Sequence, residues 1–410
     1  MDKKPERLMP EVRFKGFTDD WEQHKLGDFG NVQMNKRIFK SQTLDWGDVP
    51  FYKIGTFGKK ADAYISSELY EEYRNKYPYP KDGDLLISAS GSIGKIVEYK
   101  GQRAYYQDSN IVWLDHDNRI LNLFLKAFFQ IVKWNGTEGS TIKRLYNKNI
   151  LNTEIILPKI KEQTAVGKLI EKFDYLITLQ QRKLEQLKQL KKAMLQQLFV
   201  SKNSKQPVLR FKNFDSDWRQ HSLKDISAKT YSGLTGKSKD DFGHGKARYI
   251  TYLNVHNNEV AISDGVEQIE VDSKQNKVLK GDLLFTISSE VPSEVALNSV
   301  WSSEAGTDIY LNSFCFGIRP KSNYVNSFFL TYYLRSPQMR KLIYPLAQGI
   351  SRFNISKRSI LALKINTPVL PEQISICKVL MHIDNLITYQ QNKLTQLTTL
   401  KRYLLQKLFI

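Results

Sequence analysis

The chain has 410 residues, 41% of them hydrophobic and 12% aromatic, which is enough for two or more packed domains. Its 61 Lys and Arg residues outnumber 42 Asp and Glu residues and give a net charge of +19, which favours nucleic acid as a partner over a merely solvated cationic surface. The N-terminal residues MDKKPERLMP do not resemble a signal peptide, no apolar run is long enough for a membrane span, and Cys315 and Cys377 have no metal-ligand spacing. We therefore expect a cytoplasmic protein rather than a secreted or membrane-spanning one.

An internal repeat determines the organisation of the chain. The first copy contains the segments PEVRFKGFTDDWEQHKL, KDGDLLIS and NILNTEIILPKIKEQ, and the second contains PVLRFKNFDSDWRQHSL, LKGDLLFTIS and SILALKINTPVLPEQ. These segments begin at Pro10, Lys81 and Asn149 in the first copy and at Pro207, Leu279 and Ser359 in the second. Their spacing is wider in the second copy, which therefore holds insertions, and between Gly91 and Lys143 the copies share almost nothing. A repeated set of segments with divergent middles predicts two recognition units for different targets.

The first part of each copy, about 10–157 and 207–367, is expected to be a globular α+β domain, called a head below. Its strand candidates are rich in β-branched or aromatic residues and are bounded by Gly, Asp and Pro; they are 49–54, 84–88 and 110–114 in the first copy and 282–288 and 313–318 in the second. The amphipathic helix candidates are 122–134 and 326–342.

The second part of each copy, 162–200 and 372–410, is a Pro-free segment with heptad spacing of apolar residues, which predicts a coiled-coil helix about 58 Å long. The chain must return through the second head before the second helix starts, so the two helices should pair antiparallel. Each segment has a net charge of +3, which leaves +13 for the rest of the chain. The predicted seam residues share the a and d heptad positions and are Ile170, Ile177, Gln180, Leu184 and Leu187, with Leu380, Ile387, Gln390, Leu394 and Leu397.

The order of these repeated segments resembles that of a known family. Two globular units, each followed by an LPxxxEQ or PxLPEQ turn and a long Leu-rich helix, resemble the specificity subunit of type I restriction–modification enzymes. The turns are 157–163 and 367–373, and the first has Lys161 where the second has Pro371. The RFKGF and RFKNF leaders, GDLLIS and GDLLFTIS, and the helix ends QQLF and LQKLF add to a match that covers essentially the whole chain.

The resemblance implies that each head is a target-recognition domain for one half of a split double-stranded DNA site. It also implies that the helices set the gap and dock two methyltransferase subunits, with restriction–translocase subunits recruited further out. S-adenosylmethionine, ATP and Mg are then expected on those partners, and no cofactor on this chain. The corresponding domains are 1–157 and 207–367 for target recognition, 158–200 and 368–410 for the helical spacers, and 201–206 for a linker.

The motifs that would carry catalysis are incomplete. An adenine methyltransferase needs an Asn/Asp-Pro-Pro-aromatic loop, and the sequence has none. SGSIGK, at 90–95, lacks the glycine spacing of a phosphate-binding loop. Asp84 with Glu98 and Lys100 resembles a metal-dependent nuclease core, but Asp282 of the second copy has no such partners, so both Asp residues are expected to shape a Gly-Asp turn. We predict no catalytic residue and no metal site.

DNA contacts are expected from polar side chains of the divergent loops, because Arg and Lys recognise guanine, Asn and Gln recognise adenine, and Ser adapts to either. Two other classes stay open: a basic coiled-coil adaptor with non-specific nucleic-acid-binding heads, and an enzyme that acts alone. The candidate DNA-binding residues are Lys36, Arg37, Lys53, Ser90, Ser92, Lys95, Lys143 and Arg144 in the first copy, and Lys237, Tyr252, Asn254, Ser288, Ser289 and Arg352 in the second.

Overall fold

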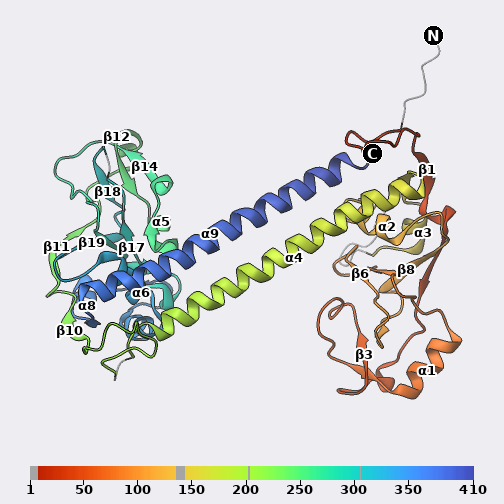
Figure 1. Cartoon of the computed structure of the whole chain (residues 1–410), viewed down its shortest axis with the longest axis horizontal. Coiled ribbons are helices and arrows are strands. Elements are labelled where there is room, and N and C mark those ends of the chain that lie inside the picture. The colour runs from red at the N-terminus through yellow and green to blue at the C-terminus, as the bar shows by residue number, and fades with distance from the viewer. Residues whose placement is uncertain (1–7, 135–143, 202–203, 305) are drawn as a thin grey trace, which may run out of the picture. The chain divides into compact units, whose positions relative to one another are not determined.

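The computed structural model describes residues 8–134, 144–201, 204–304 and 306–410. Its contacts divide the chain into two compact units, Met1–Gln181 with Asn392–Ile410, and Arg182–Gln391. Each unit contains one head and a segment of each of the two long helices (Figure 1). The predicted domains separate the heads from the helical spacers by their expected roles, whereas the two units are defined by contacts. The predicted boundaries therefore stay predictions. Among the helices that the structure describes, none combines the length and apolarity that crossing a membrane requires.

The first head is built on two small sheets and a two-stranded ribbon. The antiparallel sheet has the order β2 (Gly30–Met34), β8 (Ile111–His116), β5 (Leu85–Ser88) and β6 (Ile96–Glu98). The second sheet has the order β4 (Tyr64–Ile65), β3 (Val49–Tyr52) and β7 (Tyr105–Tyr106), with β3 parallel to β7. The ribbon pairs β1 (Glu22–Lys25) with β9 (Glu154–Leu157). The helices are α1 (Ser67–Lys76), α2 (Asn122–Phe128), α3 (Asn147–Leu151) and the 3-10 turns η1 (Leu26–Asp28) and η2 (Lys40–Gln42).

The second head repeats this plan with additions. Its larger sheet has the order β11 (Ser227–Ser232), β19 (Cys315–Pro320), β15 (Leu283–Thr286), β17 (Asn298–Trp301) and β13 (Val260–Ala261). The second sheet has β12 (Phe242–Ile250) between β14 (Val266–Ile269) and β18 (Ile309–Leu311). Two ribbons pair β10 (Arg219–Ser222) with β21 (Lys364–Thr367) and β16 (Ser288–Ser289) with β20 (Phe353–Asn354). The helices are α5 (Tyr252–Asn257), α6 (Ser327–Arg335), α7 (Pro337–Ile343) and α8 (Lys357–Leu361), with 3-10 turns η3 (Lys239–Asp241), η4 (Ser263–Gly265), η5 (Pro292–Glu294) and η6 (Tyr344–Leu346).

The α+β class and the predicted strands are confirmed, whereas two helix predictions were too long. The segment 326–342 is two helices, because Pro337 cannot continue the helix before it and holds Ser336 in an extended conformation (ψ 151°), from which its side chain caps α7. The helix predicted over 122–134 ends at Phe128. Beyond it the chain turns, and Phe129 packs against Trp134 with ring centroids 5.5 Å apart.

The two long helices, α4 (Ile160–Gln197) and α9 (Leu370–Lys407), run antiparallel, as predicted (Figure 1). In the first unit Lys401 of α9 pairs with Asp174 of α4. In the second unit Lys191 of α4 pairs with Asp384 of α9 at 2.7 Å. In each unit, therefore, the last part of one helix lies beside the first part of the other.

The end of each long helix is part of a head's core. Phe409 lies 5.1 Å from Phe124 and 6.5 Å from Trp21, between ring centroids, in the first unit. In the second unit Phe199 has the same arrangement with Phe329 and Trp218, at 5.5 and 6.5 Å. Each leader, the segment around RFK at the start of a copy, forms a backbone hydrogen bond with the end of a long helix. Val12 N–H donates to the Lys407 carbonyl of α9, and Leu209 N–H donates to the Gln197 carbonyl of α4, both at 2.9 Å. The repeated Trp and the LF helix ends therefore serve packing.

The Glu of each repeated turn binds the Arg of the leader. Arg13 donates two hydrogen bonds to Glu162, at 2.7 and 2.8 Å, and Arg210 donates two to Glu372, at 2.9 Å each. Both carboxylates are buried, and paired N–H groups of this kind are the geometry in which a guanidinium best compensates a buried carboxylate. The leader and the start of each long helix are thereby joined.

The Gln of each turn holds the helix of the head. Gln163 accepts the Leu121 backbone N–H at 2.9 Å and donates to the Pro158 carbonyl at 2.9 Å. Gln373 accepts the Asn326 N–H at 2.8 Å and donates to the Pro368 carbonyl at 2.8 Å. The bonds from Leu121 and Asn326 satisfy backbone N–H groups at the start of α2 and α6 that have no partner within the helix, and the bonds to Pro158 and Pro368 tie each Gln to the turn before its long helix. The repeated EQ pair is thus structural in both copies.

The Gly-Asp turns form as predicted. Gly83 and Gly281 have φ of 90° and 88°, which glycine adopts without the strain of a side chain. Asp84 accepts the Lys81 N–H at 2.7 Å, and Asp282 accepts the Leu279 N–H at 2.9 Å. Asp84 and Asp282 therefore shape the entry to β5 and β15.

Candidate nucleic-acid interface

In each head, the divergent loops gather at one edge of the central sheet. In the first head, β2 and β5 end at this edge and β6 and β8 begin there, as the pairs Met34 with Val112 and Ile87 with Ile96 show. The Gly-Asp turn lies at the opposite edge, where Leu85 pairs with Glu98. The sheet thus separates the repeated turn from the loops that differ between the copies.

Four loops of the first head meet at the connection between β7 and β8, residues 107–110, called the first loop junction. Its Gln107 side chain accepts the Ile54 N–H at 2.9 Å, and its Asp108 carboxylate accepts from Arg37 at 3.2 Å. The Ser109 carbonyl accepts from Arg144 at 3.1 Å, and the Asn110 side chain accepts from Ser90 at 2.7 Å. Arg37, Ser90 and Arg144 are all predicted site residues, and the structure brings them together here.

The predicted residues of the first head differ in how far their side chains are exposed. Lys36 is exposed, with its ammonium 4.9 Å from the centre of the Tyr77 ring, and Arg37 and Ser92 are also exposed. Lys53 is partly exposed and pairs with Asp62 at 2.9 Å. Lys95 donates to the Phe57 carbonyl at 2.5 Å and is only partly exposed. Lys143 lies outside the described residues.

The second head has the same arrangement around the connection between β18 and β19, residues 312–314, called the second loop junction. Asn312 N–H donates to the Ile250 carbonyl at 3.0 Å, and the Phe314 carbonyl accepts the Ile287 N–H at 2.9 Å. The first head has the matching bonds from Gln107 N–H to the Tyr52 carbonyl, at 2.9 Å, and from Ala89 N–H to the Asn110 carbonyl, at 2.8 Å. The two junctions therefore occupy the same place in the two copies.

Most predicted residues of the second head are turned toward the protein. The side chain of Lys237 is 11% exposed and lies between Asp272, at 3.0 Å, and Asp241, at 3.4 Å; its hydrogen bond to Asp272 raises the pKa of Lys237. Asn254 is buried and donates to the carbonyls of Ile262 and Gly265, each at 2.9 Å. These side chains hold loops in place.

The remaining predicted residues of the second head lie nearer the junction. Tyr252 donates to the Ser288 carbonyl at 2.6 Å, and Ser288 and Ser289 are buried in β16. Arg352 is exposed, and its guanidinium lies 5.2 Å from the centre of the Phe314 ring. Of the predicted residues in this head, Arg352 is the cation at the surface of the junction. DNA contact by any of these residues stays a prediction.

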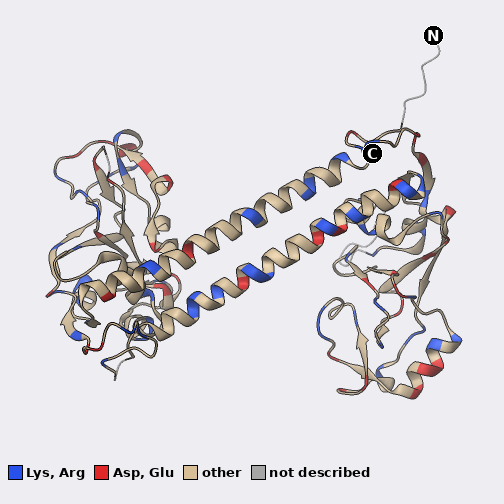
Figure 2. Cartoon of the chain, viewed as in Figure 1, with Lys and Arg blue, Asp and Glu red and all other residues tan. Residues whose placement is uncertain are grey.

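Basic side chains are spread over the loops of both heads (Figure 2). In the first head, Lys59 and Lys60 are exposed in the loop that follows β3, beyond the predicted Lys53. Exposed cations can neutralise phosphates, which supplies affinity without sequence preference. The polar run Gln107–Asn110 was missed by sequence analysis; four polar residues between two apolar strands are the signal that would have found it.

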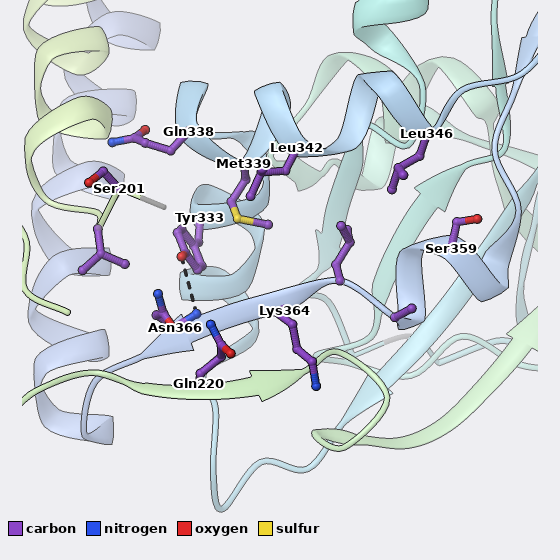
Figure 3. Close-up of a pocket in the computed structure, with 13 residues that line it drawn as sticks. Ser201, Gln220, Tyr333, Gln338, Met339, Leu342, Leu346, Ser359, Lys364 and Asn366 are labelled. Carbon is purple, nitrogen blue, oxygen red and sulfur yellow. Dashed lines mark hydrogen bonds between the residues drawn. The ribbon is translucent and has the colours of Figure 1, made fainter. Parts of the chain in front are cut away.

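The pocket in Figure 3 belongs to the repeated part of the second head. It has a volume of about 550 Å³ and lies between the end of α4, the helices α6 and α7, and the ribbon β10–β21. Tyr333 accepts the Asn366 N–H at 3.4 Å at its floor, and burial raises the pKa of Tyr333 to about 12. Its lining combines apolar residues with neutral amides and Lys364, without a pair of groups suited to acid–base catalysis. In the part of the chain that the structure describes, no cluster of His, Cys, Asp and Glu is placed to hold a metal.

Comparison with known proteins identifies the family. The type I restriction modification DNA specificity domain matches residues 18–189 and 215–399, one match in each copy. The chain belongs to this family. It is a DNA sequence-recognition subunit of a type I restriction–modification system, and its role there is to specify the site rather than to catalyse a reaction.

Individual relatives agree with this assignment. The chain is 56% identical over 153 residues to a putative type I restriction enzyme specificity subunit of Haemophilus influenzae, a match that spans 37% of this chain and 40% of that protein. It is 25% identical to the putative MjaX specificity subunit of Methanocaldococcus jannaschii, over 95% of this chain and 93% of that protein. The crystal structure of an S subunit from M. genitalium has the same fold, with a TM-score of 0.63, 16% identity, and coverage of 98% of this chain and 99% of that one.

Proposed function

We propose that each head of this specificity subunit reads one half of a bipartite double-stranded DNA site through the loops around its junction. The observation that carries this proposal is the separation within each head: the repeated residues hold the helices and the sheet, whereas the divergent loops meet at one edge. A shared scaffold with two different loop sets suits two different half-sites. The exposed cations of the loops supply the phosphate contacts that position a reader on the duplex.

The long helices are proposed to hold the two heads at a set spacing and to dock two methyltransferase subunits. Supporting this, apolar side chains remain exposed on them: Tyr175 and Leu179 of α4 in the first unit are 65% and 45% exposed, and Tyr389 of α9 in the second unit is 63% exposed. Large apolar residues on a paired helix surface are suited to packing against further helices. Restriction–translocase subunits would join this assembly in the cytoplasm, with S-adenosylmethionine, ATP and Mg bound by the partners and none by this chain.

The test is to map methylated sites in cells that contain this chain and its methyltransferase subunit. Exchange of residues 27–150 for those of a related subunit should change one half of the methylated site and leave the other half and the gap intact. A change in both halves, or in neither, would contradict independent reading by the heads. If random duplexes, RNA and single strands compete with the site duplex for binding equally well, the alternative, a non-specific basic adaptor, would be favoured instead.

A further inference from the structure

A tight hairpin lies beside the second loop junction, where Arg352 meets the Phe314 ring. Gln348 and Asn354 exchange both backbone hydrogen bonds, at 2.8 and 2.7 Å. Gly349 has a φ of 131°, and a Cβ on it would lie 2.1 Å from the Arg352 carbonyl oxygen, so the turn requires glycine at this position. The base of the hairpin is fixed, because Phe353 and Asn354 pair with Ser289 and Ser288 of β16. The residues between, 350–352, form the tip.

The side chains of this tip point away from the core. Ile350 is 98% exposed and Phe314, in the adjoining junction, is 52% exposed. The Arg352 guanidinium lies over the Phe314 ring at 5.2 Å and forms no ion pair with the carboxylates in the described part of the chain. The tip and the adjoining junction thus expose an apolar side chain, and a guanidinium without an ion pair that lies over an aromatic ring.

We propose that this hairpin, residues 348–354, enters the DNA major groove and reads the second half-site, with Arg352 donating two hydrogen bonds to a guanine and Ile350 contacting a thymine methyl group. The inference rests on the proposed function and names the residues and bases. Guanine presents N7 and O6 as paired acceptors, and thymine presents a methyl group in the same groove. Stacking on Phe314 restrains the guanidinium before DNA binds and so lowers the entropy lost on contact.

The alternative use of Arg352, a phosphate contact, fits the tip less well. A phosphate requires a positive charge and gains nothing from the apolar Ile350 beside it. A base step combines both kinds of group, since guanine acceptors and the thymine methyl lie in one groove. The fixed base of the hairpin also suits base reading, which needs a side chain held in one place.

The experiment is methylated-site mapping of the complex with the methyltransferase subunit, together with binding to duplexes that carry single base changes. Arg352→Ala should reduce discrimination at one guanine of one half-site by about 10- to 100-fold, the range of a bidentate contact. Arg352→Lys keeps the charge but replaces the planar guanidinium on Phe314 by a flexible ammonium, so it should recover only part of that discrimination. Ile350→Ser should weaken the preference for thymine at a neighbouring position of the same half-site. Arg358→Ala, which removes an exposed arginine on α8, is the matched control and should leave the site unchanged.

Several results would overturn the inference. One is an Arg352→Ala variant whose affinity falls equally for all duplexes with an unchanged site, because that describes a phosphate contact. An unaltered site and affinity, or a change in the half-site that the 27–150 exchange alters, would also refute it. Failure of the proposed function looks different: the unmodified complex would then direct no bipartite methylation at all. Because the tip is exposed, a melting curve for each variant should match that of the unmodified chain.

Discussion

Lys191 of α4 and Asp384 of α9 form an ion pair of 2.7 Å in the second unit, and Asp174 of α4 with Lys401 of α9 form its counterpart, with the two residues exchanged between helices, in the first. Both pairs also reach a head. Glu259 accepts from Lys191 at 2.7 Å, and Gln130 donates to Asp174 at 3.2 Å. The repeated ion pair therefore joins the helices to each other and to a head.

Loss of Lys191 should destabilise the second unit. Lys191→Met leaves the carboxylates of Glu259 and Asp384 without their shared cation. These side chains are 28% and 25% exposed, so we expect a loss of about 2 kcal/mol, less than the about 3–5 kcal/mol of a fully buried pair. Chemical denaturation at pH 7 measures this loss. Lys192→Met, at an exposed neighbouring position, is the control, and an equal loss in both variants would contradict a specific role for the pair.

The same pair should make the stability of the second unit depend on pH. Burial alone would raise the pKa of Glu259, but Lys191 and Arg335 lower it below its usual value in the folded chain. A carboxylate whose pKa is lower in the folded chain than in the unfolded chain stabilises the fold. This contribution is fully present when the pH is above the unfolded pKa, about 4.3, and it disappears as the pH falls through the folded pKa. Melting curves from pH 7 to pH 3 should therefore show a steeper loss below about pH 4.5 for the unmodified chain than for Glu259→Gln. Parallel curves would contradict the assignment.

The Arg210–Glu372 pair should show strong coupling. Its side chains are 11% and 1% exposed, so Arg210→Met leaves a buried carboxylate without a cation and should cost about 3–5 kcal/mol. The double variant Arg210→Met, Glu372→Gln should recover part of this loss, because an amide is cheaper to bury than a charge. The free energies of unfolding of both single variants and the double variant measure the coupling. Additive losses would show that the two residues act independently. Arg219→Met, at an exposed position in β10, is the control.

The polar seam residues should set the register of the helices. Gln180 and Gln390 are 9% and 2% exposed, as expected for seam positions, and a buried polar residue in such a seam lowers stability but disfavours slipped pairings. Gln180→Leu with Gln390→Leu should raise the melting temperature and produce mixed oligomers in light scattering. The exposed neighbours, Gln181→Leu with Gln391→Leu, are the control. A monodisperse double variant that methylates its site with an unchanged gap would show that the heads align the helices.

The length of the paired helices should set the gap between half-sites. The antiparallel ion pairs place Lys188 of α4 opposite Ile387 of α9 within the second unit. One heptad inserted after Lys188 and another before Ile387 keeps the seam on the same face and adds about 10 Å. The methylated site should keep both half-sites and gain a gap longer by about 3 bp, at about 3.4 Å per base pair. An unchanged gap would exclude the helices as the spacer.

The sequence by itself determined the organisation of this protein. Heptad and strand periodicities are local properties, so the two long helices, their antiparallel pairing and strands such as β5 and β15 could be predicted, and the internal repeat separated scaffold from divergent loops without any structure. The tertiary structure alone decided which loop residues face solvent. Lys237 forms an ion pair with Asp272, and Asn254 donates a hydrogen bond to the Gly265 carbonyl. Arg352, in contrast, stays exposed with its guanidinium over the Phe314 ring. Burial depends on residues that are distant in the sequence, and no local pattern encodes which of them will meet.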